Sequence, residues 1–218
     1  RYRDAFLQGV EYLLSGQYEN GGWPQFWPGP RGYQVHITFN DDAIVNTLNM
    51  IRDMMNHKAP YEDDLIDKTL CVRLGKAFNK GIECILATQI IKDGEPSVWC
   101  QQNDRETLKP APARAYELPS YCSAESAGIV RLLMELPAPD ARVKRAVHGA
   151  MKWFDRYKLT GLKCERIVLA NGERDTRLVE DPQAKPIWAR YYDLKYCEPY
   201  VCDRDGLPRR HLEEIGTE

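Results

Sequence analysis

The chain has 218 residues, of which 43% are hydrophobic and 28% are charged, and its formal net charge is −2. This length and hydrophobic content allow a substantial core, in one large domain or two small ones. The near-neutral charge argues against general nucleic-acid binding, and no apolar run is long enough to cross a bilayer, so we expect neither a nucleic-acid nor a membrane partner.

Apolar residues at helical spacing predict five helices, at residues 2–17, 41–55, 65–87, 123–134 and 149–161. Ser123 is placed to cap the fourth helix, although Ser126 stands where a full capping box would need Glu or Gln. A charged connection, residues 58–64, precedes the third helix. After Gly161 the helical signal fades, and the chain is compatible with short strands at residues 167–170 and 187–192 and with a turn at residues 198–206.

Part of this pattern repeats along the chain. GVEYLLSGQ at Gly9–Gln17 resembles GIECILATQ at Gly81–Gln89, and each is followed by a glycine-bearing loop and then Trp23 or Trp99. A fainter third copy lies at residues 149–161. Two helices per repeat of about 70 residues predict a mainly α fold, an (α/α) toroid or barrel of about three helical hairpins with long loops and short β-strands at the cleft end. The alternative is that any two amphipathic helices look alike.

The long loop at residues 99–122 is dense in polar and aromatic side chains. The polar and aromatic residues are Gln101, Gln102, Asp104, Lys109, Arg114, Tyr116 and Glu117. Three prolines, which stiffen a loop, lie among them: Pro110, Pro112 and Pro119. In a ring of hairpins this loop, residues 18–40 and the chain from residue 163 onward would meet at one end. We therefore expect the floor of a binding cleft there.

Asn40, Asp41 and Asp42 stand where a loop becomes a helix. Asn and Asp are favoured N-caps, so capping alone explains one of the three. Two adjacent carboxylates and an amide exceed what a cap requires, and such oxygen ligands suit a hard cation such as calcium. His36, four residues earlier, is better explained by packing in the loop than by catalysis.

Aromatic side chains crowd the first loop, and two roles for them stay open. They either pack the loop as a small core or offer flat faces on which sugar rings stack; they are Trp23, Phe26, Trp27 and Tyr33.

Arg114, Arg190 and Arg204 lie beside aromatic or acidic residues, in ARAYE, WARYY and DRDG. Most arginines are surface residues paired with carboxylates. If the loops that carry these three converge, they form a site for a polyanion, because guanidinium groups hold planar carboxylates through two hydrogen bonds. The segment CDRDG, residues 202–206, matches part of a calcium loop but lacks its other ligands, so a charged turn is the default interpretation.

The seven cysteines contain no CxxC pair of a zinc site, and their odd number leaves at least one free or paired between molecules. Cys71 and Cys84 lie among apolar helical residues and are expected to be core thiols. Cys197 and Cys202 flank Pro199, and the sequence does not decide whether they meet.

Four motifs together resemble those of the family 10 polysaccharide lyases, the pectate lyases with a helical toroid fold: NGGWPQFWP, HITFNDDAIVN, LKPAPARAYELPS, and WARYYDL with DRDG. The resemblance runs from the first residue to the last. It implies a pectate lyase that uses calcium (Ca²⁺) to cleave α-1,4-polygalacturonate by anti β-elimination. We accordingly expect residues 1–218 to form a single catalytic domain, secreted or periplasmic and monomeric, with polygalacturonate as its partner.

The resemblance also implies residue roles. Arg114 is similar to the family's Brønsted base, which takes the proton from C5 of the uronate. Asp41 is similar to a calcium ligand, with Asp42 the neighbouring candidate, and Arg190 and Arg204 to arginines that hold substrate carboxylates. Further side chains are expected to bind substrate: Lys109, Tyr116 and Trp99.

The chain begins at Arg1-Tyr2, without Met and inside a helical pattern, so we expect a domain trimmed at its ends and infer nothing from the absent signal peptide. The resemblance places another calcium-binding aspartate before residue 1 and another substrate arginine after residue 218.

Two other functions stay open on the residues alone. An inverting glycoside hydrolase would use Asp41 or Asp42 with Glu117 as its two carboxylates. A non-catalytic carbohydrate-binding module would bind pectate and yield no product.

Overall fold

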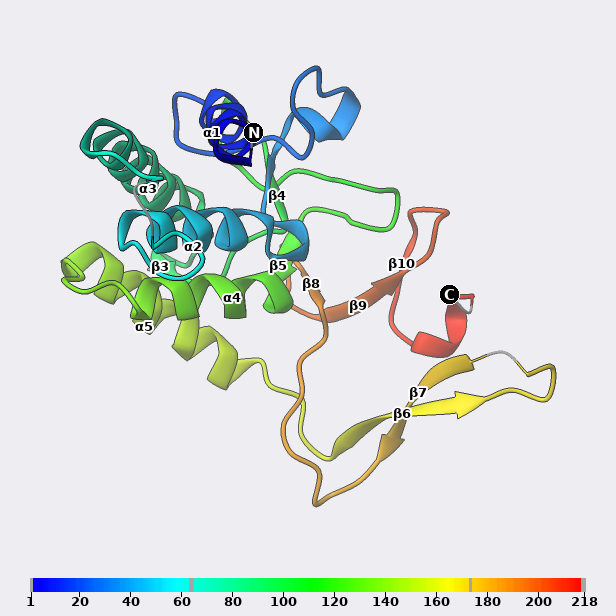
Figure 1. Cartoon of the computed structure of the whole chain (residues 1–218). Coiled ribbons are helices and arrows are strands. Elements are labelled where there is room, and N and C mark those ends of the chain that lie inside the picture. The colour runs from blue at the N-terminus through cyan, green and yellow to red at the C-terminus, as the bar shows by residue number, and fades with distance from the viewer. Residues whose placement is uncertain (1, 63–64, 173, 217–218) are drawn as a thin grey trace.

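The computed structural model describes residues 2–62, 65–172 and 174–216. The α-helices of this part of the chain all precede residue 157 and pack beside one another (Figure 1); they are α1 (Tyr2–Ser15), α2 (Ala43–Met55), α3 (Lys68–Thr88), α4 (Ser123–Met134) and α5 (Ala141–Arg156). None of these helices is long and apolar enough to span a membrane. Asp63 and Asp64, in the predicted charged connection, lie outside the described residues.

Among the described residues, the strands pair in antiparallel fashion into four small sheets. Three of the sheets have two strands each: β1 (Ile37–Thr38) with β4 (Gln102–Asn103), β2 (Ile91–Lys92) with β3 (Glu95–Pro96), and β6 (Leu162–Val168) with β7 (Arg174–Glu180). The fourth sheet has the order β10-β9-β8-β5 and contains β5 (Ser120–Cys122), β8 (Tyr191–Asp193), β9 (Pro199–Cys202) and β10 (Pro208–Arg209). Short 3₁₀ helices lie at η1 (Gly32–Val35), η2 (Asn40–Asp42) and η3 (Leu212–Glu214).

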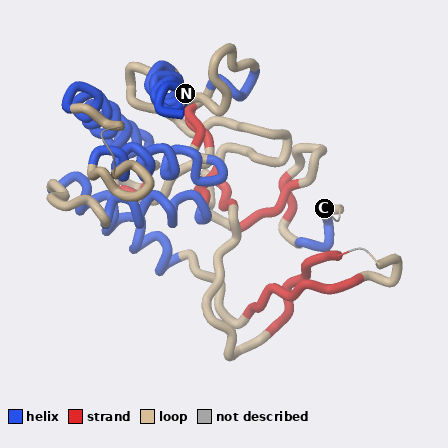
Figure 2. The backbone as a smooth tube through the Cα atoms, in the orientation of Figure 1, coloured by secondary structure: helices blue, strands red, loops and turns tan. Residues whose placement is uncertain are grey.

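The prediction of a mainly α (α/α) toroid of about three hairpins is wrong. The α-helices of the described chain all lie before residue 157. Beyond it the described residues form antiparallel strands and the 3₁₀ helix η3, and the hairpin β6–β7 extends away from the helices (Figure 2). The third copy of the repeat ends with α5. Beyond it, the segment LKCERIV ends in two β-branched residues, Ile167 and Val168, which favour a strand.

The first two copies of the repeat make matching contacts. The Gln17 amide donates to the Gly21 and Ala77 carbonyls at 2.9 Å each, and the Gln89 amide donates to the Ser97 and Ala146 carbonyls at 2.7 and 2.9 Å. In both copies the glutamine therefore joins its own loop to the helix that carries the following copy, α3 for Gln17 and α5 for Gln89. This shared contact explains why the sequence similarity includes a polar residue.

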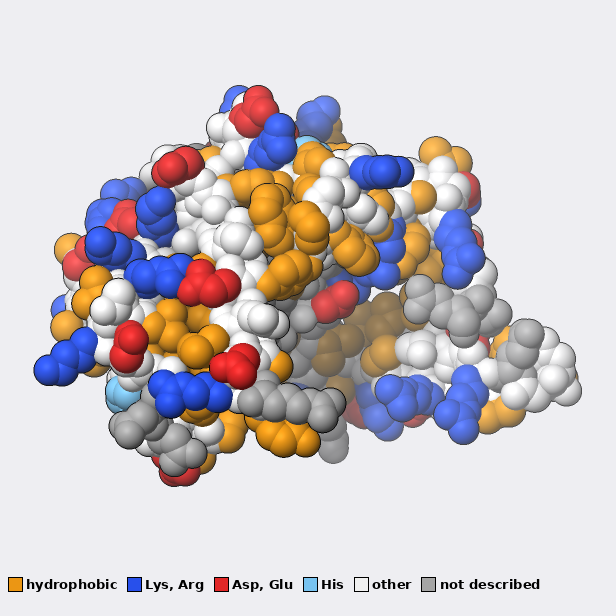
Figure 3. Space-filling view, turned by 45° about the horizontal axis from the view of Figure 1, so that its top comes forward, with side chains coloured by type: hydrophobic (Ala, Val, Ile, Leu, Met, Phe, Trp, Pro, Cys, Tyr) orange, Lys and Arg blue, Asp and Glu red, His pale blue; other side chains and the backbone are white. Residues whose placement is uncertain are grey.

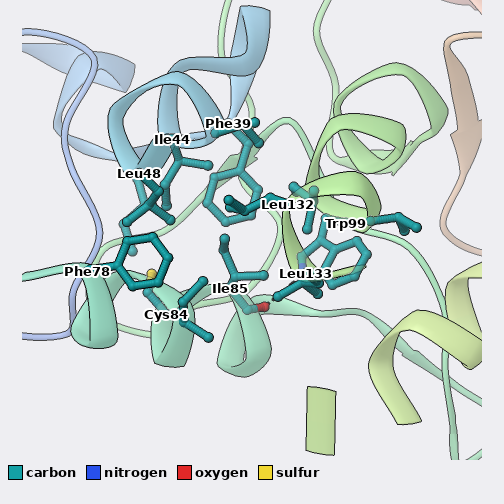
Figure 4. Close-up of a cluster of buried hydrophobic side chains, with 14 of the residues drawn as sticks. Phe39, Ile44, Leu48, Phe78, Cys84, Ile85, Trp99, Leu132 and Leu133 are labelled. Carbon is teal, nitrogen blue, oxygen red and sulfur yellow. Dashed lines mark hydrogen bonds between the residues drawn. The ribbon is translucent and has the colours of Figure 1, made fainter. Parts of the chain in front are cut away.

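The core lies between α2, α3 and α4, and Phe39 and Trp99 enter it from the loops (Figure 4). Trp99 is fully buried, and its Nε1 donates to the Ile85 carbonyl at 2.7 Å. The prediction that Trp99 binds substrate is therefore not supported, because its indole offers no surface to a ligand. Trp99 packs the core instead.

Two sequence predictions about helix ends need correction. Cys122, not Ser123, is the N-cap residue of α4, and the Ser123 hydroxyl donates to the Ala189 carbonyl at 2.7 Å. Helix α5 begins before the predicted residue 149 because Asp140 caps it, accepting from the backbone N–H groups of Arg142 and Val143.

All seven cysteines are free, so Cys197 and Cys202 do not form a disulfide. Cys84 is buried in the core as predicted, and burial raises the pKa of its thiol to about 12. A thiol with so high a pKa is not a nucleophile at neutral pH.

Strand pairing brings together the three long loops, as the sequence predicted. Strand β1 of the first loop pairs with β4 of the second, and β5 at the end of the second pairs with β8 in the C-terminal part. Residues close to these strands in sequence, at 40–42, 114–117 and 190, are thereby brought toward one another.

Candidate functional site

The turn at Asn40–Asp42 has an unusual backbone. Asp41 and Asp42 have φ values of 54° and 57°, in the left-handed region that non-glycine residues rarely adopt. Asp42 is the N-cap residue of α2, yet its side chain makes no capping hydrogen bond, and η2 has no side-chain cap either. The capping interpretation is therefore wrong for these carboxylates. Such strain persists where the surroundings impose it, and it is common at binding sites.

The two carboxylates differ in their surroundings. The Asp41 side chain is 77% exposed. The Asp42 carboxylate lies against α4 at Gly128, where an added Cβ would meet Oδ1 at 2.4 Å. Partial burial, followed by the negative charges of Glu125 and Asp41, raises the pKa of Asp42 above its ordinary value, against the opposing charge of Arg131. Negative charge is thus concentrated at this turn.

Arg190, directly before β8, connects the turn to α4. Its Nη2 donates to Glu125 Oε1 at 2.6 Å and to Asn40 Oδ1 at 3.2 Å, and lies 3.8 Å from Asp41 Oδ1. The Glu125 side chain is only 4% exposed. Burial opposes the charge on Arg190, but Glu125 raises the pKa of Arg190 above its ordinary value. The guanidinium Nε is buried and has no hydrogen-bond partner among the described residues.

Arg114 approaches the same turn from the loop between β4 and β5. Its guanidinium pairs with Glu117 and lies over the Tyr116 ring, with 5.0 Å between Cζ and the ring centroid. The hydrogen bonds to Glu117, and to a smaller extent the charge of Asp41, raise the pKa of Arg114 above its ordinary value. Asp41 therefore interacts with two arginines from different loops, Arg114 and Arg190. We call Asp41, Asp42, Arg114 and Arg190 the arginine–aspartate cluster.

Two other predicted site residues lie in exposed loops nearby. Arg204 is exposed in the turn 203–206, and that turn lies over the Arg114 loop, because a Cβ at Gly206 would sit 3.4 Å from the Ala115 carbonyl. Lys109 is exposed in the loop that carries Arg114. The turn 203–206 is a charged turn, as the sequence suggested, with Asp205 paired to Arg209.

The aromatic residues of the first loop differ in their burial. Trp23 is buried and its Nε1 donates to the Leu13 carbonyl at 2.9 Å, whereas Phe26 is 55% exposed. Together with Trp27 they line a cavity of about 430 Å³ that also contains Asp41. In Figure 3 the surface is hollowed between the helices and the C-terminal strands, with acidic and basic side chains at the edge of the hollow.

Within the described residues, no three His, Cys, Asp or Glu side chains converge to hold a metal ion. Asp41 and Asp42 fit a hard cation by ligand type and by their concentrated negative charge. Calcium takes six to eight oxygen ligands, so the rest of its shell would come from substrate, water or parts of the protein beyond these two residues.

The two buried glutamates were not predicted as partners of the arginines. Glu117 was predicted as a polar residue of the cleft floor or as a hydrolase carboxylate, and no role was predicted for Glu125. One signal was present: Glu125 lies in the first turn of the apolar segment SAESAGIVRLLM, where a buried carboxylate requires a cationic partner. The sequence contains no signal of which arginine supplies it.

A family model described as pectic acid lyase matches residues 1–218. Among solved structures, a family 10 polysaccharide lyase from Cellvibrio cellulosa has a TM-score of 0.88 and 31% identity, over 99% of this chain and 65% of that chain. A mutant of that lyase in complex with trigalacturonic acid has a TM-score of 0.88 and 31% identity, over 99% of this chain and 66% of that chain. The chain thus spans about two thirds of the length of these structures. Comparison with curated proteins gave no match. Because the family model covers the chain from residue 1 to residue 218, the chain belongs to the pectic acid lyase family.

Proposed function

We propose that this chain carries the catalytic site of a calcium-dependent pectate lyase that cleaves α-1,4-polygalacturonate by anti β-elimination. The observation that supports this most is that Asp41 lies 3.8 Å from Arg190 and also interacts through its charge with Arg114, an arginine of a separate loop. The similar lyase crystallised with trigalacturonic acid supports an acidic galacturonide as substrate.

The proposed roles follow from where charge develops. Removing the C5 proton of a uronate places negative charge beside an existing carboxylate, so cationic groups must face that carboxylate. Arg190 and Arg204 would hold substrate carboxylates, and Arg114 would accept the C5 proton in its neutral form. Lys109 and Tyr116 are further candidates for substrate contact. Since Glu117 and Asp41 favour protonated Arg114, elimination is expected to be fastest at alkaline pH.

Asp41 and Asp42 would supply carboxylate oxygens to the calcium ion. When bound, the ion would neutralise the substrate carboxylate and stabilise the charge that develops next to it. Neither aspartate side chain makes a capping hydrogen bond, so helix capping does not occupy either carboxylate.

The inverting-hydrolase alternative is disfavoured by the state of Glu117. A general acid must be protonated and must reach the leaving oxygen. Glu117 is 1% exposed, and both its oxygens accept hydrogen bonds from Arg114. Burial raises the pKa of Glu117, but the hydrogen bonds from Arg114 outweigh burial and bring the pKa below its ordinary value. An ionised, enclosed carboxylate cannot serve as that acid.

Product chemistry tests the proposal. Incubation with polygalacturonate at alkaline pH should give an unsaturated uronide that absorbs ultraviolet light, and a chelator should stop its formation until calcium is restored. Reducing sugar without ultraviolet absorbance would indicate hydrolysis instead. Binding with no product at any pH would indicate a non-catalytic module. Secretion or periplasmic location, a monomeric state and a single catalytic domain over residues 1–218 stay predictions.

Gly128→Ala should disturb the cluster without unfolding the protein. Alanine favours a helix more than glycine by about 1 kcal/mol, but the added Cβ would displace the Asp42 carboxylate. We expect an unchanged or higher melting temperature and a higher calcium concentration for half-maximal elimination. Gly75→Ala in α3 is the matched control, because its Cβ would meet only Met55 Cε at 3.5 Å. Equal calcium dependence in the two variants would contradict the placement of Asp42.

A further inference from the structure

We propose that Glu117 is the positioning residue of this site, which fixes the direction of the Arg114 guanidinium by binding it through both carboxylate oxygens. This inference rests on the proposed function, because it assigns Glu117 a role in the elimination in which Arg114 is the base.

The contacts of Glu117 define one orientation of Arg114. Glu117 Oε2 accepts from Arg114 Nε at 2.8 Å and from the Arg114 backbone N–H at 3.0 Å, and Oε1 accepts from Nη2 at 2.5 Å. The loop is closed by backbone bonds from Glu117 N to the Arg114 carbonyl at 2.8 Å and from Ala113 N to the Glu117 carbonyl at 3.0 Å. With Nε and Nη2 engaged, Nη1 is the guanidinium nitrogen that makes no hydrogen bond to another described residue.

The pair is asymmetric in exposure. The Glu117 side chain is 1% exposed, whereas the Arg114 side chain is 40% exposed. A carboxylate buried this completely carries a desolvation penalty, so a pair that only stabilised the loop could be replaced by apolar packing without loss. Here the buried member holds a guanidinium that stays accessible to a ligand, and the Tyr116 ring supports that guanidinium from a second side. The arrangement is that of an accessible guanidinium held in one orientation.

The same contacts have a consequence for proton transfer. The titratable and charged groups that face Arg114 are Glu117 and Tyr116 from its own loop and Asp41 from the turn before α2, and Arg190 faces Glu117. Glu117 favours the protonated guanidinium, so it orients the base while opposing its deprotonation. Removing the charge of Glu117 should therefore lower the pKa of Arg114 and make its neutral form available at lower pH.

Glu117→Gln tests the inference, because it keeps the shape of the side chain and removes its charge. We expect the rising limb of the kcat–pH profile to move to lower pH by about one unit or more. Since the Gln amide accepts through one oxygen only, kcat at the plateau should fall about tenfold, with a smaller change in KM. The profile is measured on polygalacturonate at saturating calcium, and circular dichroism checks folding.

Glu125→Gln is the matched comparison, since Glu125 is also a buried glutamate paired with one arginine. It should weaken substrate binding through Arg190 and leave the rising limb in place. If Glu117→Gln does not fold, Glu117→Asp retains the charge and shortens the reach; it should lower kcat without moving the limb. The inference is overturned if a folded Glu117→Gln variant keeps the wild-type kcat and the wild-type position of the rising limb of the kcat–pH profile, or if Glu117→Asp keeps full kcat.

Arg114→Ala separates this inference from the proposed function. If Glu117→Gln has no effect while Arg114→Ala is inactive, only this inference is rejected. If Arg114→Ala is active, the proposed base is rejected.

Discussion

Replacement of Arg114 by alanine should lower kcat for elimination by about 10²–10⁴-fold, the range typical of a lost general base, with little change in KM. In the proposed mechanism the C5 proton would then have no acceptor in the cluster, while Arg190 and Arg204 would still bind carboxylates. The rate is measured as ultraviolet absorbance of the unsaturated product, and binding is measured separately with trigalacturonate.

One side effect of this change can be separated from catalysis. Without Arg114, the buried Glu117 carboxylate loses its partner, and breaking a buried pair in this way typically costs about 3–5 kcal/mol of stability. The double variant Arg114→Ala/Glu117→Gln removes that unpaired charge and should regain stability while staying inactive. Arg105→Ala is the control in the same loop, because Arg105 is exposed and lies over Tyr18 at 6.0 Å. Turnover in a folded Arg114→Ala near the wild-type rate would exclude Arg114 as the base.

The helices were largely predictable because their core faces follow one periodicity. Ile44, Leu48 and Ile51 recur on one side of α2 and are all buried. The overall architecture was not predictable from that signal. Only the helical copies of the repeat could be recognised in the sequence. The structure adds that their glutamines, Gln17 and Gln89, make matching contacts. The C-terminal strands depend on pairing between distant residues, such as Tyr121 with Tyr192, which no local pattern encodes.

The candidate site divides in the same way. Asp41, Arg114 and Arg190 could be named from their motifs, because chemistry constrains the residue type. Trp99 was misassigned because an aromatic residue beside a polar loop has the same local sequence whether it packs the core or faces a sugar. The buried glutamates that pair with the arginines could not be identified from the sequence. Glu125 and Arg190, for example, are brought together only by the pairing of β5 with β8. The sequence therefore indicated the proposed site residues better than the buried glutamates that pair with them.

Asp41→Asn should raise the calcium concentration needed for half-maximal elimination by about 10–100-fold or more. Mutating residues that only support the direct ligands of a metal ion already lowers metal affinity by about 10–100-fold, and Asp41 is proposed as a direct ligand. Asparagine is the sharpest substitution here because it keeps the side-chain shape and tolerates the left-handed backbone at φ 54° while removing the charge. A second readout does not depend on catalysis: calcium should raise the melting temperature of the wild-type protein by mass action, and this rise should shrink in Asp41→Asn.

Asp53→Asn is the control for this second prediction, because Asp53 lies near the other end of α2 and pairs with Lys58 at 3.3 Å. It should leave both the calcium dependence and the calcium-induced rise in melting temperature at wild-type values. If saturating calcium restores kcat in Asp41→Asn, the aspartate acts through cation binding and not through contact with the sugar. Unaltered calcium dependence of both rate and melting temperature in Asp41→Asn would mean that the exposed carboxylate facing Arg114 and Arg190 serves only to pair with those arginines.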